Sequence, residues 1–380
     1  MCAHRDSCVV RTSAGALPGK TLNCLQRPVS PGREWRVQRA AAMRAIRWSI
    51  AAVVVGCTSG SGPVGVDPDE AAADDGTRGN LGTAVPDVRC AGAPDAGPAG
   101  AFRHVSSTVI AALGDPRHRG FDLIASADAA SQELAGWISY TVADKALEDE
   151  DVDVFACHAG AWQRVGTART DDEGHFALAL SDTRRLPIGM RDLFVSVVGD
   201  RTGVGFVGYV APAGTPLVVS DVDGTLTSSE NAFFETIVLG VEPDAQPGAA
   251  QVFGTAEAAG RQLVYVTARG GQYTSETRTW LDHKGFPRGP VRLSPSFVTL
   301  PGDDTVAYKM RTIAALSAAG FTLVSGVGNR ASDIAAYAAT GVAADHIFIK
   351  LPEFQSEVQP QLDAHQAVGF LNYRELAGAL

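Results

Sequence analysis

Residues 217–225 read Leu217-Val218-Val219-Ser220-Asp221-Val222-Asp223-Gly224-Thr225, an apolar run followed directly by two acidic residues and a glycine. A short apolar run bounded by turn residues is typical of a strand that is buried on both faces of a sheet. Because the two aspartates are one residue apart, one can attack phosphorus while the other faces the leaving oxygen. Gly224 lets the backbone turn closely about a phosphate. The stretch therefore predicts a buried strand that ends in a phosphate-handling turn.

Further apolar runs lie toward the C-terminus, at residues 263–266, 321–324 and 347–349. Stretches rich in Ala and Leu, such as 310–319 and 334–339, lie between or after them. Buried strands that alternate with helices favour a Rossmann-like, doubly wound parallel sheet. Ligands of such a sheet gather beyond the carboxyl ends of its strands. We therefore expect an α/β domain over residues 214–380 with its site at that edge.

Polar residues follow the later runs in a definite order. Thr267 ends the run at 263–266, Lys309 lies in Ala-Tyr-Lys-Met, and Asn329 and Asp333 follow the run at 321–324. Each has a plain structural alternative, as a strand residue, a solvated helix residue or an acid at a helix start. Their order after the first strand favours a shared site.

These ordered motifs resemble those of the haloacid dehalogenase (HAD) superfamily. The resemblance implies that Asp221 is the nucleophile and that Asp223 is the acid and base, which must arrive protonated to donate to the departing alcohol. It also implies that Thr267 hydrogen-bonds the phosphoryl oxygens. Lys309 would neutralise charge on the phosphate and on the aspartyl intermediate.

The same resemblance implies a bound Mg²⁺. Its expected ligands are the Asp221 carboxylate, the Asp223 backbone carbonyl and Asp333, with Asn329 as a nearby ligand or an outer group. Oxygen donors completed by water suit this ion.

The spacing of the motifs limits what else the domain contains. About 43 residues separate Asp223 from Thr267, and about 41 separate Thr267 from Lys309. These intervals leave no room for a separate cap domain at either insertion point of the superfamily. We therefore expect a capless, open site, which in this superfamily tends to act on substrates too large to enclose.

Two segments, residues 286–296 and 328–337, look like the catalytic C-terminal domain of lipins, the LNS2 domain, over about residues 214–350. The resemblance implies that phosphatidate at a membrane surface is dephosphorylated to diacylglycerol. Arginines would then face the phosphate or the lipid headgroup through bidentate contacts. The substrate-binding residues expected on this basis are Gly224, Thr225, Arg269, Arg288 and Arg330.

Two alternatives stay open. Related domains of phosphatidylinositol-transfer proteins have lost catalytic aspartates and serve as phosphatidate-binding modules, whereas Asp221 and Asp223 are both present here. The other alternative is a HAD phosphatase that acts on a soluble or protein phosphate ester.

Residues 101–213 contain short β-branched and aromatic runs between turn residues, which predicts a β-sandwich. Residues 166–176 resemble a hairpin of immunoglobulin-like modules, a likeness of fold and not of activity. Residues 203–208 match a dinucleotide-binding glycine pattern. Because strand-like residues follow them, we interpret these glycines as turn and strand spacers.

The N-terminal part reads differently. Residues 1–42 are Arg-rich without apolar periodicity, and we interpret them as a mis-chosen start. Residues 43–57 have a basic start and a short apolar run ending in Val-Val-Gly-Cys, which resembles a bacterial lipoprotein signal. The resemblance implies an exported protein, periplasmic or at the outer membrane, anchored by a lipid on Cys57. The alternative is a buried apolar segment with an incidental cysteine.

Composition bears on the order of residues 58–100, on nucleic acid as a partner and on the state of two cysteines. Residues 58–100 are rich in Gly, Ala, Pro and Asp and predict a disordered linker. The net charge of -10 argues against nucleic acid as a partner. Cys90 and Cys157 form either one disulfide or two free thiols. No pattern assigns an oligomeric state.

Overall fold

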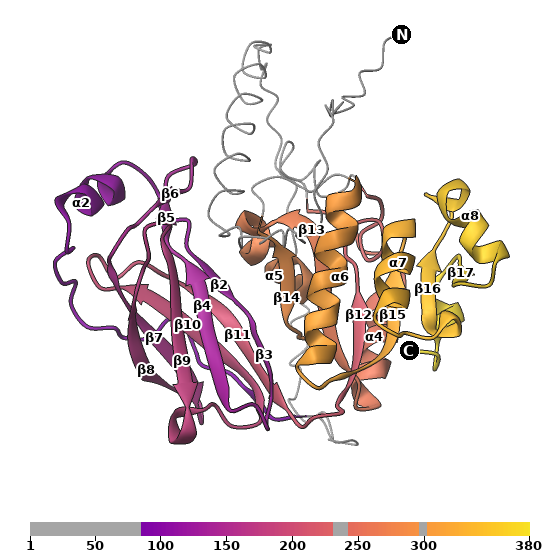
Figure 1. Ribbon diagram of the computed structural model, residues 1–380, viewed down its shortest axis with the longest axis horizontal. Helices are drawn as coiled ribbons and strands as arrows, with labels where there is room; N and C mark the ends of the chain where they lie inside the picture. Colours follow the sequence, from indigo (N-terminus) through magenta and orange to yellow (C-terminus); the bar gives the residue numbers. More distant parts are fainter. Residues whose placement is uncertain (1–84, 231–241, 296–301) are drawn as a thin grey trace, which may run out of the picture. The chain divides into compact units, whose positions relative to one another are not determined.

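The computed structural model describes residues 85–230, 242–295 and 302–380, and Figure 1 shows how their helices and strands follow one another. These residues belong to one compact unit and form a β-sandwich followed by an α/β domain. The predicted leader over residues 1–42, the signal over 43–57 and Cys57 itself lie outside the described residues.

The β-sandwich consists of two main sheets. One has the strand order β3-β11-β10-β7-β8, with β1 also paired to β10, and the other has the order β2-β4-β9. Leu134, Val154 and Phe176 are buried between them. This arrangement confirms the predicted sandwich. Its elements are β1 (Asp87–Val88), α2 (Val105–Ala112), β2 (Arg119–Phe121), β3 (Leu123–Ser126), β4 (Ser131–Trp137), β5 (Ser139–Tyr140), β6 (Lys145–Ala146), β7 (Asp151–His158), β8 (Ala161–Arg169), β9 (His175–Ser181), η1 (Asp182–Arg184), β10 (Gly189–Val197) and β11 (Gly203–Ala211).

The glycines at residues 203–208 lie within β11, which pairs antiparallel with β10. The next element is the strand β12, not a helix. Their position agrees with the interpretation as strand spacers.

The α/β domain is built on a parallel sheet with the strand order β14-β13-β12-β15-β16-β17. The chain runs outward from β12 in one direction and then restarts at β15 in the other, which confirms the predicted doubly wound fold. The elements are β12 (Pro216–Ser220), α4 (Ala249–Ala258), β13 (Gln262–Gly270), η2 (Gly271–Tyr273), α5 (Thr274–His283), β14 (Val291–Ser294), α6 (Gly302–Ala318), β15 (Thr322–Gly328), α7 (Ala331–Ala339), η3 (Ala344–His346), β16 (Ile347–Lys350), α8 (Gln355–Asp363), β17 (Val368–Phe370) and η4 (Tyr373–Leu376).

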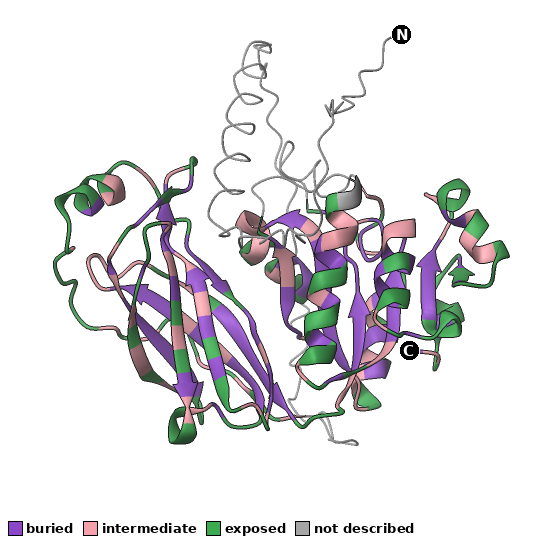
Figure 2. Cartoon of the chain, viewed as in Figure 1, coloured by how far each residue is buried: buried purple, intermediate pink, exposed green. Residues whose placement is uncertain are grey.

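The sheet is apolar on both faces because consecutive residues of a strand point to opposite sides. Val218 packs with Phe253 of α4 on one face, whereas Leu217 packs with Ile334 of α7 on the other. Figure 2 shows the buried strands in purple between helices whose outer faces are green. In the two intervals where a cap would be inserted, the described residues form only elements of this core fold.

The predicted linker over 58–100 is wrong for its last part, residues 85–100. Strand β1 pairs in parallel with β10, and Cys90 forms a disulfide with Cys157, with an Sγ–Sγ distance of 1.96 Å. The indole of Trp162 also donates to the carbonyl of Gly92. Backbone pairing and a covalent bond to a strand order this segment despite its linker-like composition.

None of the helices in the part of the chain that the structure describes has the length and apolar character needed to span a bilayer.

Asp122, between β2 and β3, connects the two domains. Its carboxylate accepts the N–H of Val207 in β11 at 2.8 Å and the N–H of Val291 in β14 at 2.7 Å. It also pairs with Nη2 of Arg278 on α5 at 2.9 Å, and its side chain is 0% exposed. A single buried carboxylate thus supports hydrogen bonds from three elements of both domains.

We expect Asp122→Ala to lower the free energy of unfolding by about 3 kcal/mol or more, since two buried N–H groups lose their acceptor at about 1–3 kcal/mol each. Urea denaturation of the full chain measures this change. The control is Asp128→Ala, because Asp128 is exposed and its carboxylate has no partner among the described residues. Equal midpoints for the two variants would contradict the assigned role.

Candidate active site

The motif residues meet at the carboxyl ends of β12, β13 and β15. Asp221 directly follows β12, Thr267 lies near the end of β13, and Asp333 lies in the first turn of α7 after β15. Because β12 has β13 on one side and β15 on the other, this is the point where the strand order reverses. Ligands of doubly wound sheets bind at such a point.

Lys309, from α6, lies between two carboxylates. Its Nζ is 2.7 Å from Oδ1 of Asp221 and 2.6 Å from Oδ1 of Asp333. Asp221 and Lys309 are each 4% exposed and Asp333 is 0% exposed. The three side chains therefore form a nearly dry cluster of alternating charge.

Burial sets the protonation behaviour of this cluster. It raises the pKa of Asp221 above its usual value, with Asp333 adding to the rise, whereas the Lys309 ammonium opposes the rise and favours the carboxylate. Burial also disfavours charge on Lys309, but the two carboxylates outweigh it and raise the pKa of Lys309 above its usual value. Lys309 is therefore a permanent cation of the site.

The turn after β12 shapes the space around Asp221. Thr225 Oγ1 donates to Oδ2 of Asp221 at 3.1 Å, and the N–H of Gly224 donates to Thr227 at 2.8 Å. Gly224 has a φ of +66°, and a Cβ there would lie 2.1 Å from Nδ2 of Asn329. Only glycine therefore fits between this turn and the residue after β15.

Both carboxylate oxygens of Asp223 accept hydrogen bonds from Arg269. Arg269 Nη2 is 2.7 Å from Oδ1 of Asp223, and its Nε is 2.9 Å from Oδ2. Thr267 Oγ1 donates to the same Oδ2 at 3.0 Å, because residues 267 and 269 share one side of β13. Arg269 is 2% exposed, and its Nη1 donates to Thr277 of α5.

Arg269 thus lies at the site and contacts Asp223 and Thr277, and its contact with a phosphate stays a prediction. The prediction is wrong for Arg288. That residue precedes β14, at the amino edge of the sheet, and pairs there with Asp87 and Asp192 of the sandwich.

Arg330 lies at the mouth of the site. Its Nη2 is 3.0 Å from Glu357, its Nη1 is 3.5 Å from Glu230, and its guanidinium stacks 3.8 Å from the ring centroid of Phe354. It is about one-third exposed, at 34%. Arg330 therefore lies beside the motif residues, linked to Asn329 through Glu230.

Glu230 is a residue of the site that the sequence analysis missed. Its Oε2 accepts from Nδ2 of Asn329 at 2.9 Å, and burial raises its pKa above the usual value. Its only sequence signal is an acidic residue soon after Thr227, in a segment with no strand or helix period. Such proximity depends on where β15 places Asn329.

The oxygen donors suit a hard cation. Oδ1 of Asn329 is buried and has no hydrogen-bond partner among the described residues, and the backbone N–H of the same residue donates to the buried carboxylate of Asp333 at 3.1 Å. Among the described residues, however, no three acidic, His or Cys side chains stand close enough together to form a metal cage. The amide oxygen and a backbone carbonyl would have to complete the donor set.

We expect Gly224→Ala to destabilise the chain more than Gly248→Ala. Both glycines have positive φ, +66° and +79°, so both variants bear the left-handed cost of about 1 kcal/mol. Only at Gly224 does the new methyl collide with Asn329, since the nearest atom at Gly248 is 3.9 Å away. Thermal unfolding of both variants measures the difference, and equal losses would contradict the tight packing of the turn.

Two family models match the chain. The model described as PITM 1-3, beta-sandwich domain matches residues 116–210, and the model described as PITM 1-3, LNS2 domain matches residues 218–350. The LNS2-type prediction is therefore supported by the match to the LNS2 domain of PITM 1-3 proteins.

Two curated relatives illustrate the similarity. Human membrane-associated phosphatidylinositol transfer protein 3 is 28% identical over 236 residues, which cover 61% of this chain and 23% of the relative. Protein retinal degeneration B of Drosophila melanogaster is 28% identical over 236 residues, covering 61% of this chain and 18% of the relative. The chain thus spans about a fifth of the length of the curated relatives it matches.

Two solved structures are similar to part of the chain. A Class C acid phosphatase from Bacillus anthracis with tungstate bound has a TM-score of 0.28 at 18% identity, covering 42% of this chain and 67% of that one. A putative beta-phosphoglucomutase from Thermotoga maritima has a TM-score of 0.31 at 14% identity, covering 43% and 97%. Over its two described domains, this chain is similar in sequence to the beta-sandwich and LNS2 domains of PITM 1-3 proteins.

Proposed function

We propose that this chain is a Mg²⁺-dependent phosphatase that converts phosphatidate to diacylglycerol and phosphate through a phospho-aspartate on Asp221. The observation that carries the proposal is the position of Lys309, 2.7 Å from Asp221 and 2.6 Å from Asp333 at the reversal of the sheet. A buried nucleophile beside a fixed cation is suited to attack an anionic phosphate.

In the first step, a carboxylate oxygen of Asp221 forms a bond to phosphorus as the bond to the lipid oxygen breaks. Thr225 holds the other carboxylate oxygen, so the attacking group is oriented before the substrate arrives. Lys309 offsets the negative charge of the phosphate as it meets Asp221, and then that of the phospho-aspartate. Asp223 supplies the proton that the departing alcohol oxygen needs.

In the second step, water attacks the phosphorus of the phospho-aspartate and loses a proton to Asp223, which releases phosphate and restores Asp221. In the structure, the carboxylate of Asp223 accepts hydrogen bonds from Arg269 and Thr267. It must exchange one of these contacts before it carries a proton. Arg269 is therefore a positioning residue for the acid and base.

The chain's own residues fit Mg²⁺ in donor type. The Asp221 carboxylate, the Asp223 carbonyl, Asp333 and the unpartnered Oδ1 of Asn329 would hold it. Bound there, the ion would offset charge on the phosphate during transfer.

The choice of phosphatidate rests on two supports. The described part of the domain has only core elements around the site, which suits a substrate at a surface. The LNS2 match and the relatives' names, membrane-associated phosphatidylinositol transfer proteins, point to a phospholipid at a membrane. We infer that phosphatidate reaches the site from a membrane surface.

A second candidate is a phosphatidate-binding module without turnover. The engagement of Asp223 by Arg269 and Thr267 favours it, because the group assigned as acid is already saturated with donors. The similarity to transfer proteins also agrees with binding.

We expect the full chain to release phosphate from phosphatidate vesicles only with Mg²⁺, and Asp221→Asn to be slower by at least about 10³-fold, as for loss of a nucleophile. Asp345→Asn is the control, since Asp345 is exposed on η3. Phosphate release is measured directly.

If the chain binds phosphatidate vesicles but releases no phosphate, the phosphatase proposal is wrong and the phosphatidate-binding module is supported. Equal turnover of phosphatidate and glycerol 3-phosphate would overturn the lipid assignment in favour of a soluble ester.

We further propose that the protein is exported and anchored by a lipid on Cys57. The disulfide between Cys90 and Cys157 supports an oxidising compartment. In a bacterial host that processes lipoproteins, Cys57→Ser should move the protein out of the membrane fraction, while Cys24→Ser should not. Unchanged fractionation of Cys57→Ser would refute the anchor.

A further inference from the structure

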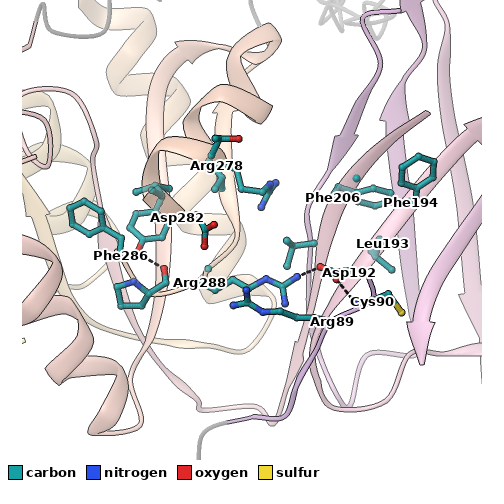
Figure 3. Close-up of a pocket in the computed structure, with 18 of the residues that line it drawn as sticks. Arg89, Cys90, Asp192, Leu193, Phe194, Phe206, Arg278, Asp282, Phe286 and Arg288 are labelled. Atoms are coloured by element: carbon teal, nitrogen blue, oxygen red, sulfur yellow. Dashed lines mark hydrogen bonds and ion pairs between the residues drawn. The ribbon is translucent and has the colours of Figure 1, made fainter. Parts of the chain in front are cut away.

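A cavity of about 400 Å³ lies between the β-sandwich and the α/β domain (Figure 3). Strands β8, β10 and β11 form one side of it, and α5, β13 and the segment before β14 form the other. Its lining residues do not include Asp221, Asp223, Thr267, Lys309, Asn329 or Asp333. The cavity is therefore a second site, independent of the proposed active site.

The body of the cavity is apolar. Phe194 and Phe206 come from the sandwich, and Leu281 and Phe286 come from the α/β domain. Figure 3 shows the two sandwich rings on one side and Phe286 on the other. The volume falls in the range of about 300–1,000 Å³ typical of small-molecule pockets. An apolar chain suits this space better than a polar metabolite.

Arginine side chains at the cavity retain donors that no protein group uses. Arg278 gives its Nη2 to Asp122, but its Nη1 is buried and has no hydrogen-bond partner. Arg89 is engaged by Asp87 through Nε alone among the described residues. A buried guanidinium nitrogen without an acceptor favours an anionic ligand group.

The acidic residues at the cavity do not use these donors. Asp192 accepts from Arg288 and from the N–H of Cys90, so both of its oxygens are occupied. Asp282 is exposed and interacts with Arg89 only through its charge. The Nη1 of Arg278 thus has no acceptor among the described residues.

We propose that this cavity binds a single-chain acidic lipid, with its apolar chain between the aromatic walls and its carboxylate or phosphate on Nη1 of Arg278. The shared chemistry is one chain with one anionic end. A fatty acid and a lysophosphatidate both satisfy it.

Gly205 offers a way to fill the cavity without disturbing the fold. It is exposed on β11 and lines the cavity, and a Cβ there would have its nearest neighbour, the carbonyl of Leu193, at 3.8 Å. Gly205→Leu therefore adds a side chain where ligand would lie. Gly254→Leu is the matched control, because Gly254 on α4 has nothing within 4 Å and is not part of the cavity.

The test titrates the full chain carrying Asp221→Asn, without Mg²⁺, with laurate, lauroyl lysophosphatidate and dodecanol below their aggregation limits. Calorimetry measures the affinity. We expect Gly205→Leu to weaken both acids at least tenfold and Gly254→Leu to leave them unchanged. Dodecanol should bind at least tenfold more weakly than the better acid, which identifies the head group.

Arg278→Gln, checked by thermal unfolding for a folded state, should weaken the acids and not dodecanol. Absence of binding by both acids, undiminished binding to Gly205→Leu, or equal affinity for dodecanol would overturn the proposal. Since the nucleophile is already removed, none of these results depends on phosphatase activity.

Discussion

The candidate site depends on one ammonium group between two buried carboxylates. Without Lys309, Asp221 and Asp333 would be two like charges in a dry space, and removing one partner of such a buried set costs about 3–5 kcal/mol. The three groups come from the end of β12, from α6 and from α7. Residues of these same elements share one apolar core, which includes Leu217, Ile313 and Ile334. The packing of the helices on the sheet therefore also fixes the positions of the charges, because a shift of either helix would separate the ammonium from its carboxylates.

Asp221, Thr267 and Asp333 were predictable because each follows a recognisable apolar run, whereas Lys309 lies within α6 and was predicted from its place in the order of the motifs. The order of Asp221, Thr267, Lys309 and Asp333 is a property of the chain, and a doubly wound sheet brings such strand ends to one edge whatever the details of packing. The same reasoning predicted the β-sandwich, since alternating runs and turns are local patterns. Local composition failed for residues 85–100, which are ordered by β10 and by Cys157 rather than by their own sequence.

The arginines show why side-chain partners were harder to predict than strands. Arg269 lies two residues after Thr267, so its position on the site side of β13 follows from the strand period. The partner of Arg269 does not follow from the strand period, because the choice between a phosphate and Asp223 depends on the turn after β12. Arg288 belongs to a segment that resembles a catalytic domain, yet it serves the contact with Asp87 and Asp192 of the sandwich. A motif match predicts the position of a residue in the fold, but it does not predict the contacts that the residue makes with a neighbouring domain.

Helix α5 touches both sites of the molecule through consecutive residues. Thr277 accepts from Nη1 of Arg269, which holds Asp223, and Arg278 pairs with Asp122 and faces the interdomain cavity. Neighbouring residues on a helix point about 100° apart, so one short helix reaches the catalytic turn on one side and the sandwich on another. In the proposed mechanism, Asp223 exchanges a contact with Arg269 or Thr267 before it carries a proton. The packing of α5, which holds Arg269 through Thr277, therefore helps to position the proposed acid.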